Sequence, residues 1–144
     1  MPYTYNYPRA AVTVDCLVYR LANSAREILL IQRKNEPYKG KWALPGGFLE
    51  MDENLHDAAV RELREETGLS IPVLEQFHTF DAVDRDPRHR TISTVFIGKP
   101  GKGSGTLKAA SDASEAKWFK LLNLPGLAFD HNEIIDLAIQ RKLI

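Results

Sequence analysis

The 144-residue chain has little of several features that would place a protein outside the cell or in a membrane. It contains a single cysteine, Cys16, which excludes an intrachain disulfide and predicts an intracellular, cytoplasmic location. Its longest apolar runs are only a few residues, too short to span a membrane. Residues 1–9 lack a basic segment followed by an apolar stretch, so no signal peptide is predicted.

An excess of charge of one sign is absent as well. The 19 lysines and arginines balance the 19 aspartates and glutamates. This balance argues against a general nucleic-acid or membrane surface, and neither partner is expected, although a local cluster could still bind a small anion. The hydrophobic fraction of 44% and the charged fraction of 26% are ordinary for one globular core, so residues 1–144 are predicted to form a single domain.

The pattern of apolar residues predicts an α/β fold with a mixed sheet and helices packed against it. β-Branched and apolar residues predict strands at 10–19, 27–33, 71–83 and 91–97, with shorter apolar segments at 42–44 and 116–121. Residues 54–67 lack proline and glycine and predict a helix, capped by Asp52 or Asn54 and ended by Gly68. A last helix is predicted to start at Asp130, whose spacing to Glu133 fits a capping box.

Three glutamates share one face of the first predicted helix. Glu62, Glu65 and Glu66 are spaced i, i+3, i+4, and like charges at this spacing do not stabilise a helix. An apolar stripe lies beside them, made of Leu55, Ala59 and Leu63. The carboxylates therefore border the buried side, where clustered oxygens suit Mg²⁺ or Mn²⁺. Taken alone, the helix is equally compatible with a solvated, ion-paired face.

The spacing between the helix glutamates and the preceding glycine pair favours a metal site over a solvated face. Gly47 is followed by Glu53 after five residues and by Arg61-Glu62 after seven more. Leu63, Glu65, Glu66, Gly68 and Leu69 complete the pattern G-x5-E-x7-R-E-U-x-E-E-x-G-U, where U is apolar. This pattern is the Nudix box, with every specified position filled, and the chain resembles the Nudix hydrolase family. The resemblance implies a Nudix-type α/β/α sandwich with a mixed β-sheet over the whole length, as a single Nudix hydrolase domain.

The resemblance implies that the catalytic residues are those of the box: Glu53, Arg61, Glu62, Glu65 and Glu66. The three helix glutamates match metal-binding and base-handling carboxylates, whereas Glu53 and Arg61 match positions that orient the loop and helix. The carbonyl of Gly46 matches a further metal ligand, and Asp112 is a candidate from a late loop. A bound Mg²⁺ or Mn²⁺ would neutralise a diphosphate and acidify a water. Which glutamate acts as the base stays open.

Two segments, one that leads into the box and one that follows it, resemble the ADP-ribose pyrophosphatase branch of the family. They are residues 41–48, leading into the box, and the charged stretch 84–90, DRDPRHR, which resembles R-D-P-R-G-R with His89 in place of glycine. The candidate substrate-binding residues are Arg85, Arg88, Arg90, Trp42 and Phe48. Arginines suit phosphate or ribose oxygens and aromatic rings suit a base, but a solvated charged hairpin and core aromatics are the structural alternatives.

The sequence thus predicts metal-dependent hydrolysis of a nucleoside diphosphate linked to another moiety, with ADP-ribose giving AMP and ribose 5-phosphate. One alternative is a hydrolase of oxidised or non-standard nucleoside triphosphates. Another is a non-catalytic ADP-ribose-sensing module; related regulators carry a winged-helix segment after this domain, for which no room is expected beyond Ile144. The expected partner is a small nucleotide substrate, and a homodimer is the default.

Overall fold

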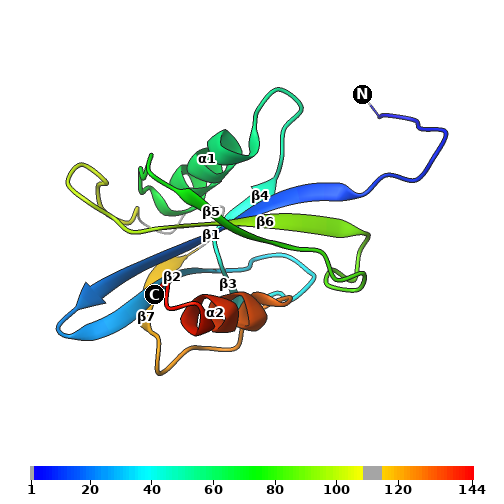
Figure 1. Cartoon of the computed structure of the whole chain (residues 1–144). Coiled ribbons are helices and arrows are strands. Elements are labelled where there is room, and N and C mark those ends of the chain that lie inside the picture. Colours follow the sequence, from blue (N-terminus) through cyan, green and yellow to red (C-terminus); the bar gives the residue numbers. More distant parts are fainter. Residues whose placement is uncertain (1, 109–114) are drawn as a thin grey trace.

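The computed structural model describes residues 2–108 and 115–144, and in this part of the chain one seven-stranded sheet lies between two helices (Figure 1). The elements in chain order are β1 (Ala11–Ala22), β2 (Ala25–Gln32), β3 (Trp42–Ala43), β4 (Gly46–Phe48), α1 (Leu55–Thr67), β5 (Glu75–Phe80), β6 (Thr91–Gly98), β7 (Ala116–Lys120) and α2 (His131–Gln140). No helix within the described ranges is long and apolar enough to cross a membrane.

The sheet is mixed, as predicted. Its main path runs β3-β2-β1-β6-β5, with β4 paired to β1 and β7 paired to β2. β1 runs parallel to β6 and antiparallel to β2 and β4. A tight turn joins β1 to β2, in which Asn23 and Ser24 have φ values of 52° and 65°, as a two-residue hairpin turn requires. The pairing of β4 with β1 sets Gly46 opposite Asp15 and Phe48 opposite Thr13.

Alternation along the central strands builds a core on each face of the sheet, and this confirms the sandwich. On β1, Val14, Cys16 and Val18 pack in the α1 layer, whereas Leu17 packs in the α2 layer. On the α1 side the helix contributes Ala58, Ala59 and Leu63, and on the other side α2 contributes Ile134, Ile135 and Ala138. Strands covered on both faces read as nearly continuous apolar runs, which explains the imperfect alternation of the sequence.

The capping predicted for α1 is present. The side chain of Asn54 accepts a hydrogen bond from the Asp57 amide at 2.9 Å. Gly68 has a φ of +84°, and its amide donates to the Arg64 carbonyl at 2.9 Å. Both caps satisfy backbone groups that the helix leaves unpaired, so they fix where the helix carrying the glutamates begins and ends.

The capping box predicted for α2 was wrong. Asp130 is the N-cap of this helix, but its side chain makes no capping hydrogen bond. Instead, its carboxylate accepts two hydrogen bonds from Arg85, at 2.9 and 2.7 Å. A guanidinium binds both carboxylate oxygens at once, and this charged interaction replaces the weaker contact with a backbone amide.

The strand predicted at 71–83 is shorter in the structure, where β5 covers Glu75–Phe80. Ile71 and Leu74 are buried beneath α1, yet they lie in an irregular segment that precedes the strand. Pro72 lacks an amide donor and therefore cannot take a full part in a sheet ladder. The apolar residues of this segment predicted a strand because they belong to the core, although residues 71–74 are not part of a strand.

Candidate functional site

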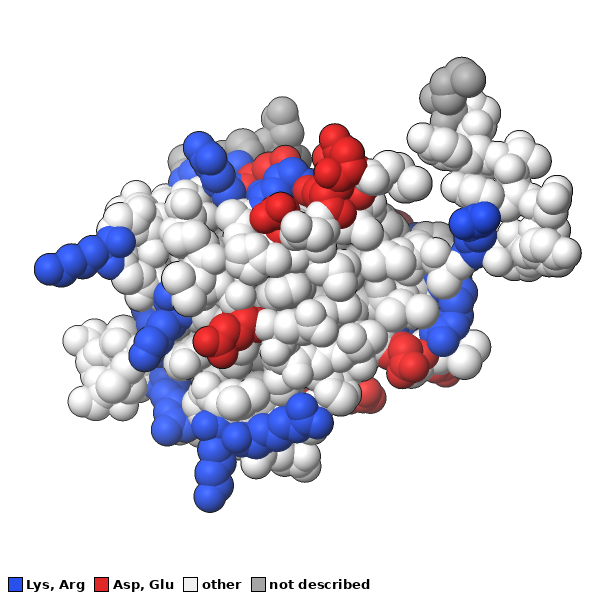
Figure 2. All heavy atoms as spheres, turned by 45° about the horizontal axis from the view of Figure 1, so that its top comes forward, with Lys and Arg blue, Asp and Glu red and all other residues white. Residues whose placement is uncertain are grey.

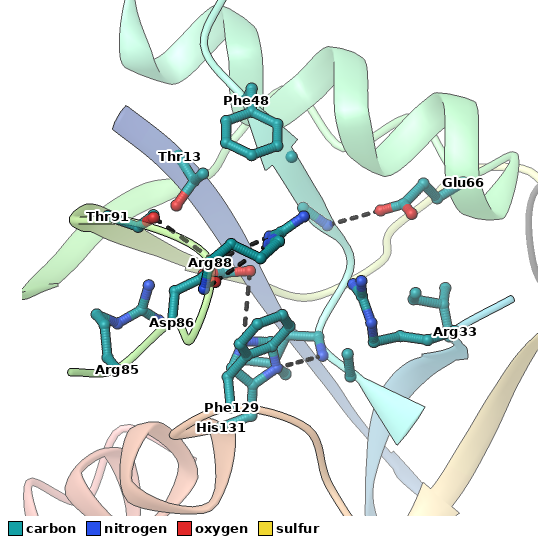
Figure 3. A pocket seen from close by; sticks show the side chains of 16 residues that line it. Thr13, Arg33, Phe48, Glu66, Arg85, Asp86, Arg88, Thr91, Phe129 and His131 are labelled. Carbon is teal, nitrogen blue, oxygen red and sulfur yellow. Dashed lines mark hydrogen bonds and ion pairs between the residues drawn. The ribbon is translucent and has the colours of Figure 1, made fainter. Parts of the chain in front are cut away.

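A cavity of about 280 Å³ opens where the box meets the N-terminal half of β1 (Figure 3). Its walls come from β1, β4, the end of α1, the loop 84–90 and the start of α2. The predicted site residues that line it include Gly46 and Phe48 from β4, Glu66 from α1, and Arg85 and Arg88 from the loop. The fold thus brings together segments from one end of the chain to the other.

Glu66 is the box carboxylate that reaches into this cavity. Its Oε1 accepts a hydrogen bond from the Gly46 amide at 2.7 Å, which ties the end of α1 to the start of β4. Burial raises the pKa of Glu66 to about 8; the Gly46 hydrogen bond opposes the rise, and the negative charges of Glu62 and Asp15 add to it. Carboxylates therefore gather around Glu66, where the charge of Arg33 opposes their effect on its pKa only in part, as in sites that bind a further cation.

Glu62 lies against the glycine that opens the box. A Cβ placed on Gly47 would lie 2.4 Å from Oε1 of Glu62, so a larger residue would displace this carboxylate from the position it occupies. The Arg61 guanidinium donates to the same carboxylate at 2.9 Å. Burial nevertheless raises the pKa of Glu62, against the effect of Arg61. Gly47 and Arg61 together leave the carboxylate little freedom to move.

Arg61 links the β4–α1 loop to α1. It donates to both oxygens of Glu53, at 2.9 and 2.6 Å, and to the Phe48 carbonyl at 3.2 Å. The hydrogen bond from Arg61 lowers the pKa of Glu53 to about 2, and the Glu50 amide also donates to Glu53, at 2.9 Å. In Figure 2, acidic and basic side chains are interleaved near the top of the view, on the side that carries α1. The hydrogen bonds that Arg61 donates to Glu53 and to the Phe48 carbonyl fit the orienting role predicted for Glu53 and Arg61.

The predicted metal ligands differ in their surroundings. Glu65 has a side chain that is 59% exposed, with Arg61 3.3 Å away, whereas Glu62 and Glu66 are partly buried. Among residues 2–108 and 115–144, no three acidic, histidine or cysteine side chains converge on one point as a metal cage. The donor set still fits a hard divalent cation, because it consists of carboxylate oxygens, and Glu62 and Glu66 are partly buried on the same helix. Asp112 lies outside the described residues.

Two of the predicted arginines line the cavity with their guanidinium groups already bound. Arg85 is buried and forms a two-pronged ion pair with Asp130, at 2.9 and 2.7 Å. Arg88 binds Asp86 in the same way, at 3.1 and 2.8 Å. Both pairs stiffen the loop 84–90, and Arg85 fastens it to the start of α2.

Of the other three residues predicted to contact the substrate, one lines the cavity and two lie away from it. Phe48 is 45% exposed and lines the cavity. Trp42 packs edge-on against Phe119, with ring centroids 4.7 Å apart, in the core beneath α2. Arg90 donates to the carbonyls of residues 81 and 82, at 2.7 and 3.2 Å, and so links the two ends of this loop. The structure thus places Trp42 and Arg90 outside the lining of this cavity.

A buried polar cluster forms part of the cavity wall, and the sequence analysis did not propose it. Asp15 accepts a hydrogen bond from Ser93 at 2.5 Å, and its other oxygen lies 3.6 Å from Nε2 of His131. Nδ1 of His131 accepts the Leu44 amide at 2.9 Å, so the ring proton of the neutral form is on Nε2, facing Asp15. Burial lowers the pKa of His131. Asp15 could have been noticed as a charge inside an apolar strand, whereas His131 carries no such signal.

Arg33 and Phe129 also line the cavity and were not predicted. The Arg33 guanidinium lies 4.9 Å from the centre of the Phe129 ring. Phe129 in turn meets the Tyr38 ring edge-on, with centroids 4.9 Å apart. An arginine directly after an apolar strand is a weak signal, and nothing local to Phe129 distinguishes it from a core aromatic.

Comparison with known proteins identifies the family of this fold. The NUDIX domain family matches residues 10–138, and the chain belongs to the Nudix family. The "ADP-ribose pyrophosphatase" of Methanocaldococcus jannaschii is 49% identical over 129 residues, which are 90% of this chain and 73% of that protein. The "ADPR responsive transcriptional repressor NtrR" of Acinetobacter baylyi is 36% identical over 141 residues, 94% of this chain but only 56% of its own length.

Solved structures with the same fold include two of particular interest. A MutT/nudix family protein from Enterococcus faecalis superposes with a TM-score of 0.86 at 33% identity, covering 99% of this chain and 65% of that one. The NUDIX domain of Shewanella oneidensis NrtR, complexed with ADP ribose, superposes with a TM-score of 0.81 at 33% identity, covering 94% and 90%. The fold class predicted from the sequence is confirmed by these neighbours.

Proposed function

We propose that this protein is a Nudix pyrophosphohydrolase that hydrolyses ADP-ribose to AMP and ribose 5-phosphate with the help of Mg²⁺ or Mn²⁺. The observation that carries the proposal is the complete box, whose Glu66 lies in the wall of a cavity that also contains arginines and aromatic rings. The relative that is 49% identical bears the name of this activity, which supports ADP-ribose as the substrate.

Some residues of the box would bind the cation, and the others hold these ligands in position. Glu62, Glu65 and Glu66, with the Gly46 carbonyl, would hold the metal, whose charge would neutralise the diphosphate and acidify a water. Arg61 fixes the direction of Glu62 through its hydrogen bond and is itself held by the carboxylate of Glu53. One of the three helix glutamates, where it does not itself contact the metal, would accept the proton of the attacking water.

A binding-only module is the second candidate. It is favoured by the likeness to the NrtR domain complexed with ADP ribose and to a repressor described as ADPR-responsive. Such a module would take the same ligand without cleaving it, so binding measurements cannot separate the two functions. The filled set of carboxylates supports turnover, because binding alone does not require them.

A substrate panel tests the proposal against both alternatives. The purified protein with Mg²⁺ is offered ADP-ribose, NADH, a dinucleoside polyphosphate and 8-oxo-dGTP at equal concentration, and products are separated by chromatography. We expect AMP from ADP-ribose at the highest kcat/KM. Preference for 8-oxo-dGTP would assign the protein to the clearance of oxidised nucleotides, and tight ADP-ribose binding without cleavage over hours would assign it to sensing.

The partner and the location belong to the same proposal. We expect a small nucleotide as the ligand, with a homodimer as the assembled form, which light scattering of the purified protein measures directly. A cytoplasmic location agrees with the single, buried Cys16, since no intrachain disulfide can form. A monomer at micromolar concentration would remove the dimer from the proposal without affecting the reaction.

A further inference from the structure

The junction between β3 and β4 consists of Leu44 and Pro45, which belong to neither strand. Pro45 has no amide donor. The amide before it, that of Leu44, donates to Nδ1 of His131 at 2.9 Å. The amide after it, that of Gly46, donates to Oε1 of Glu66 at 2.7 Å. Figure 3 draws both hydrogen bonds, so side chains from α2 and α1 hold the junction from its two ends.

His131 supplies a hydrogen-bond acceptor where the backbone of the junction needs one. Leu44 is 2% exposed and packs in the core beneath α2, so its amide is shielded from water. A buried amide without an acceptor is costly, and the chain would have to shift to satisfy it. Only a neutral imidazole with its proton on Nε2 can accept this bond at Nδ1. The place of the junction therefore depends on the form and the orientation of one ring.

A buried carboxylate favours that form of the ring. Nε2 of His131 faces Oδ1 of Asp15 at 3.6 Å, and the other oxygen of Asp15 accepts the Ser93 hydroxyl at 2.5 Å. Asp15 and His131 are 8% and 3% exposed, so water screens their interaction little. The carboxylate attracts the proton of the ring to Nε2 and leaves Nδ1 free to accept, as in pairs of histidine and carboxylate that orient metal ligands.

The backbone that leads into α2 is itself fastened to β3. The Trp42 amide donates to the Gly126 carbonyl at 3.1 Å, and the Ala128 amide donates back to the Trp42 carbonyl at 2.8 Å. His131 follows three residues later, and Leu44 lies two residues beyond Trp42. The two partners of the hydrogen bond are thus brought together by the backbone, which limits how far either can move.

We propose that His131 is a positioning residue for the metal site: by accepting the Leu44 amide, it sets the place of Gly46 and of the Glu66 carboxylate that the Gly46 amide binds. Asp15 is its partner and fixes the tautomer. In this role His131 acts through the backbone of residues 44–46 and does not itself bind the metal. The inference rests on the proposed function in taking Gly46 and Glu66 as metal ligands.

The test compares two amide substitutions of His131 by their binding of Mn²⁺ alone, measured from the loss of the free-ion EPR signal. His131→Asn keeps an oxygen near the position of Nδ1, whereas His131→Gln carries its amide to the position of Nε2. We expect the asparagine variant to bind Mn²⁺ within about threefold of the wild type, and the glutamine variant to bind about tenfold more weakly. Loss of packing alone predicts the reverse order, because the shorter asparagine leaves the larger void.

His78→Gln is the matched control, since it makes the same change at a histidine on β5 that does not line the cavity. The ring of His78 contacts Phe77 and Phe80. We expect this variant to bind Mn²⁺ like the wild type. Circular dichroism of every variant at the assay temperature shows whether it is folded.

The order of the two affinities decides the proposal. It is supported if His131→Gln binds Mn²⁺ more than about threefold more weakly than His131→Asn, and overturned otherwise. If the glutamine variant does not fold, the asparagine variant decides alone: near wild-type binding supports the proposal, and weakened binding overturns it. A wild type that binds no Mn²⁺ overturns it as well. A wild type that binds Mn²⁺ without cleaving ADP-ribose removes the proposed activity alone and leaves the role of His131 tested.

Discussion

Replacing Glu66 by glutamine keeps the size of the side chain and removes its negative charge. The glutamine oxygen can still accept the Gly46 amide, which donates to Glu66 at 2.7 Å. In the metal-free protein the ionised Glu66 is unfavourable, because burial raises its pKa from 4.5 to about 8. We therefore expect Glu66→Gln to be more stable than the wild type at alkaline pH and to have lost its metal-dependent activity.

The size of the effect follows from the two pKa values of Glu66, 4.5 unfolded and about 8 folded. A carboxyl with a raised pKa contributes its full stability below pH 4.5 and loses that contribution as the pH rises through 8. At about 1.4 kcal/mol per pKa unit, the wild type is expected to lose about 3 kcal/mol relative to Glu66→Gln between about pH 5.5 and pH 8.

The assay is urea unfolding of both proteins across this pH range, in EDTA and again in saturating Mg²⁺. In EDTA the difference in the free energy of unfolding should grow with pH, and Mg²⁺ should stabilise the wild type far more than the variant. Glu133→Gln, at an exposed position on α2, is the control and should follow the wild type. Equal stabilisation of the wild type and Glu66→Gln by Mg²⁺, or a variant that is less stable at pH 8, would refute the reasoning.

Three further predictions address the scaffold and the cofactor. Asp130→Ala strips the buried Arg85 of its partner, and we expect urea unfolding to show a loss of about 3–5 kcal/mol; a loss under 1 kcal/mol would contradict the role of this pair. Gly47→Ala places a Cβ against Glu62 and should lower kcat about 100-fold, whereas Gly101→Ala, with open space around it, should leave kcat unchanged. EDTA should abolish ADP-ribose hydrolysis and added Mg²⁺ or Mn²⁺ should restore it, so activity that persists in EDTA would exclude a metal-dependent reaction.

The sequence predicted the fold well where the signal is local. The cap at Asn54, the glycine that ends α1 and the buried strand around Cys16 all follow from neighbouring residues, and the structure confirms each. The capping box at Asp130 failed because a residue 45 positions away, Arg85, binds the same carboxylate. No pattern within one segment reveals such competition.

The cavity was harder to predict than the box. The box positions are spaced along one loop and helix, whereas the cavity combines residues from segments as distant as Arg33 and Phe129. The sequence predicted substrate contacts from the arginines of the loop 84–90, because this stretch resembles a segment of the ADP-ribose pyrophosphatase branch. Their carboxylate partners became visible only once Asp86 and Asp130 were placed in space.

The most direct test of the account is the release of AMP from ADP-ribose by the purified protein in Mg²⁺, compared with Glu66→Gln under the same conditions. The account predicts AMP and ribose 5-phosphate in equal amounts from the wild type, and a loss of at least about 100-fold in kcat for the variant. A wild type that releases no AMP, or a Glu66→Gln protein that remains fully active, would contradict it.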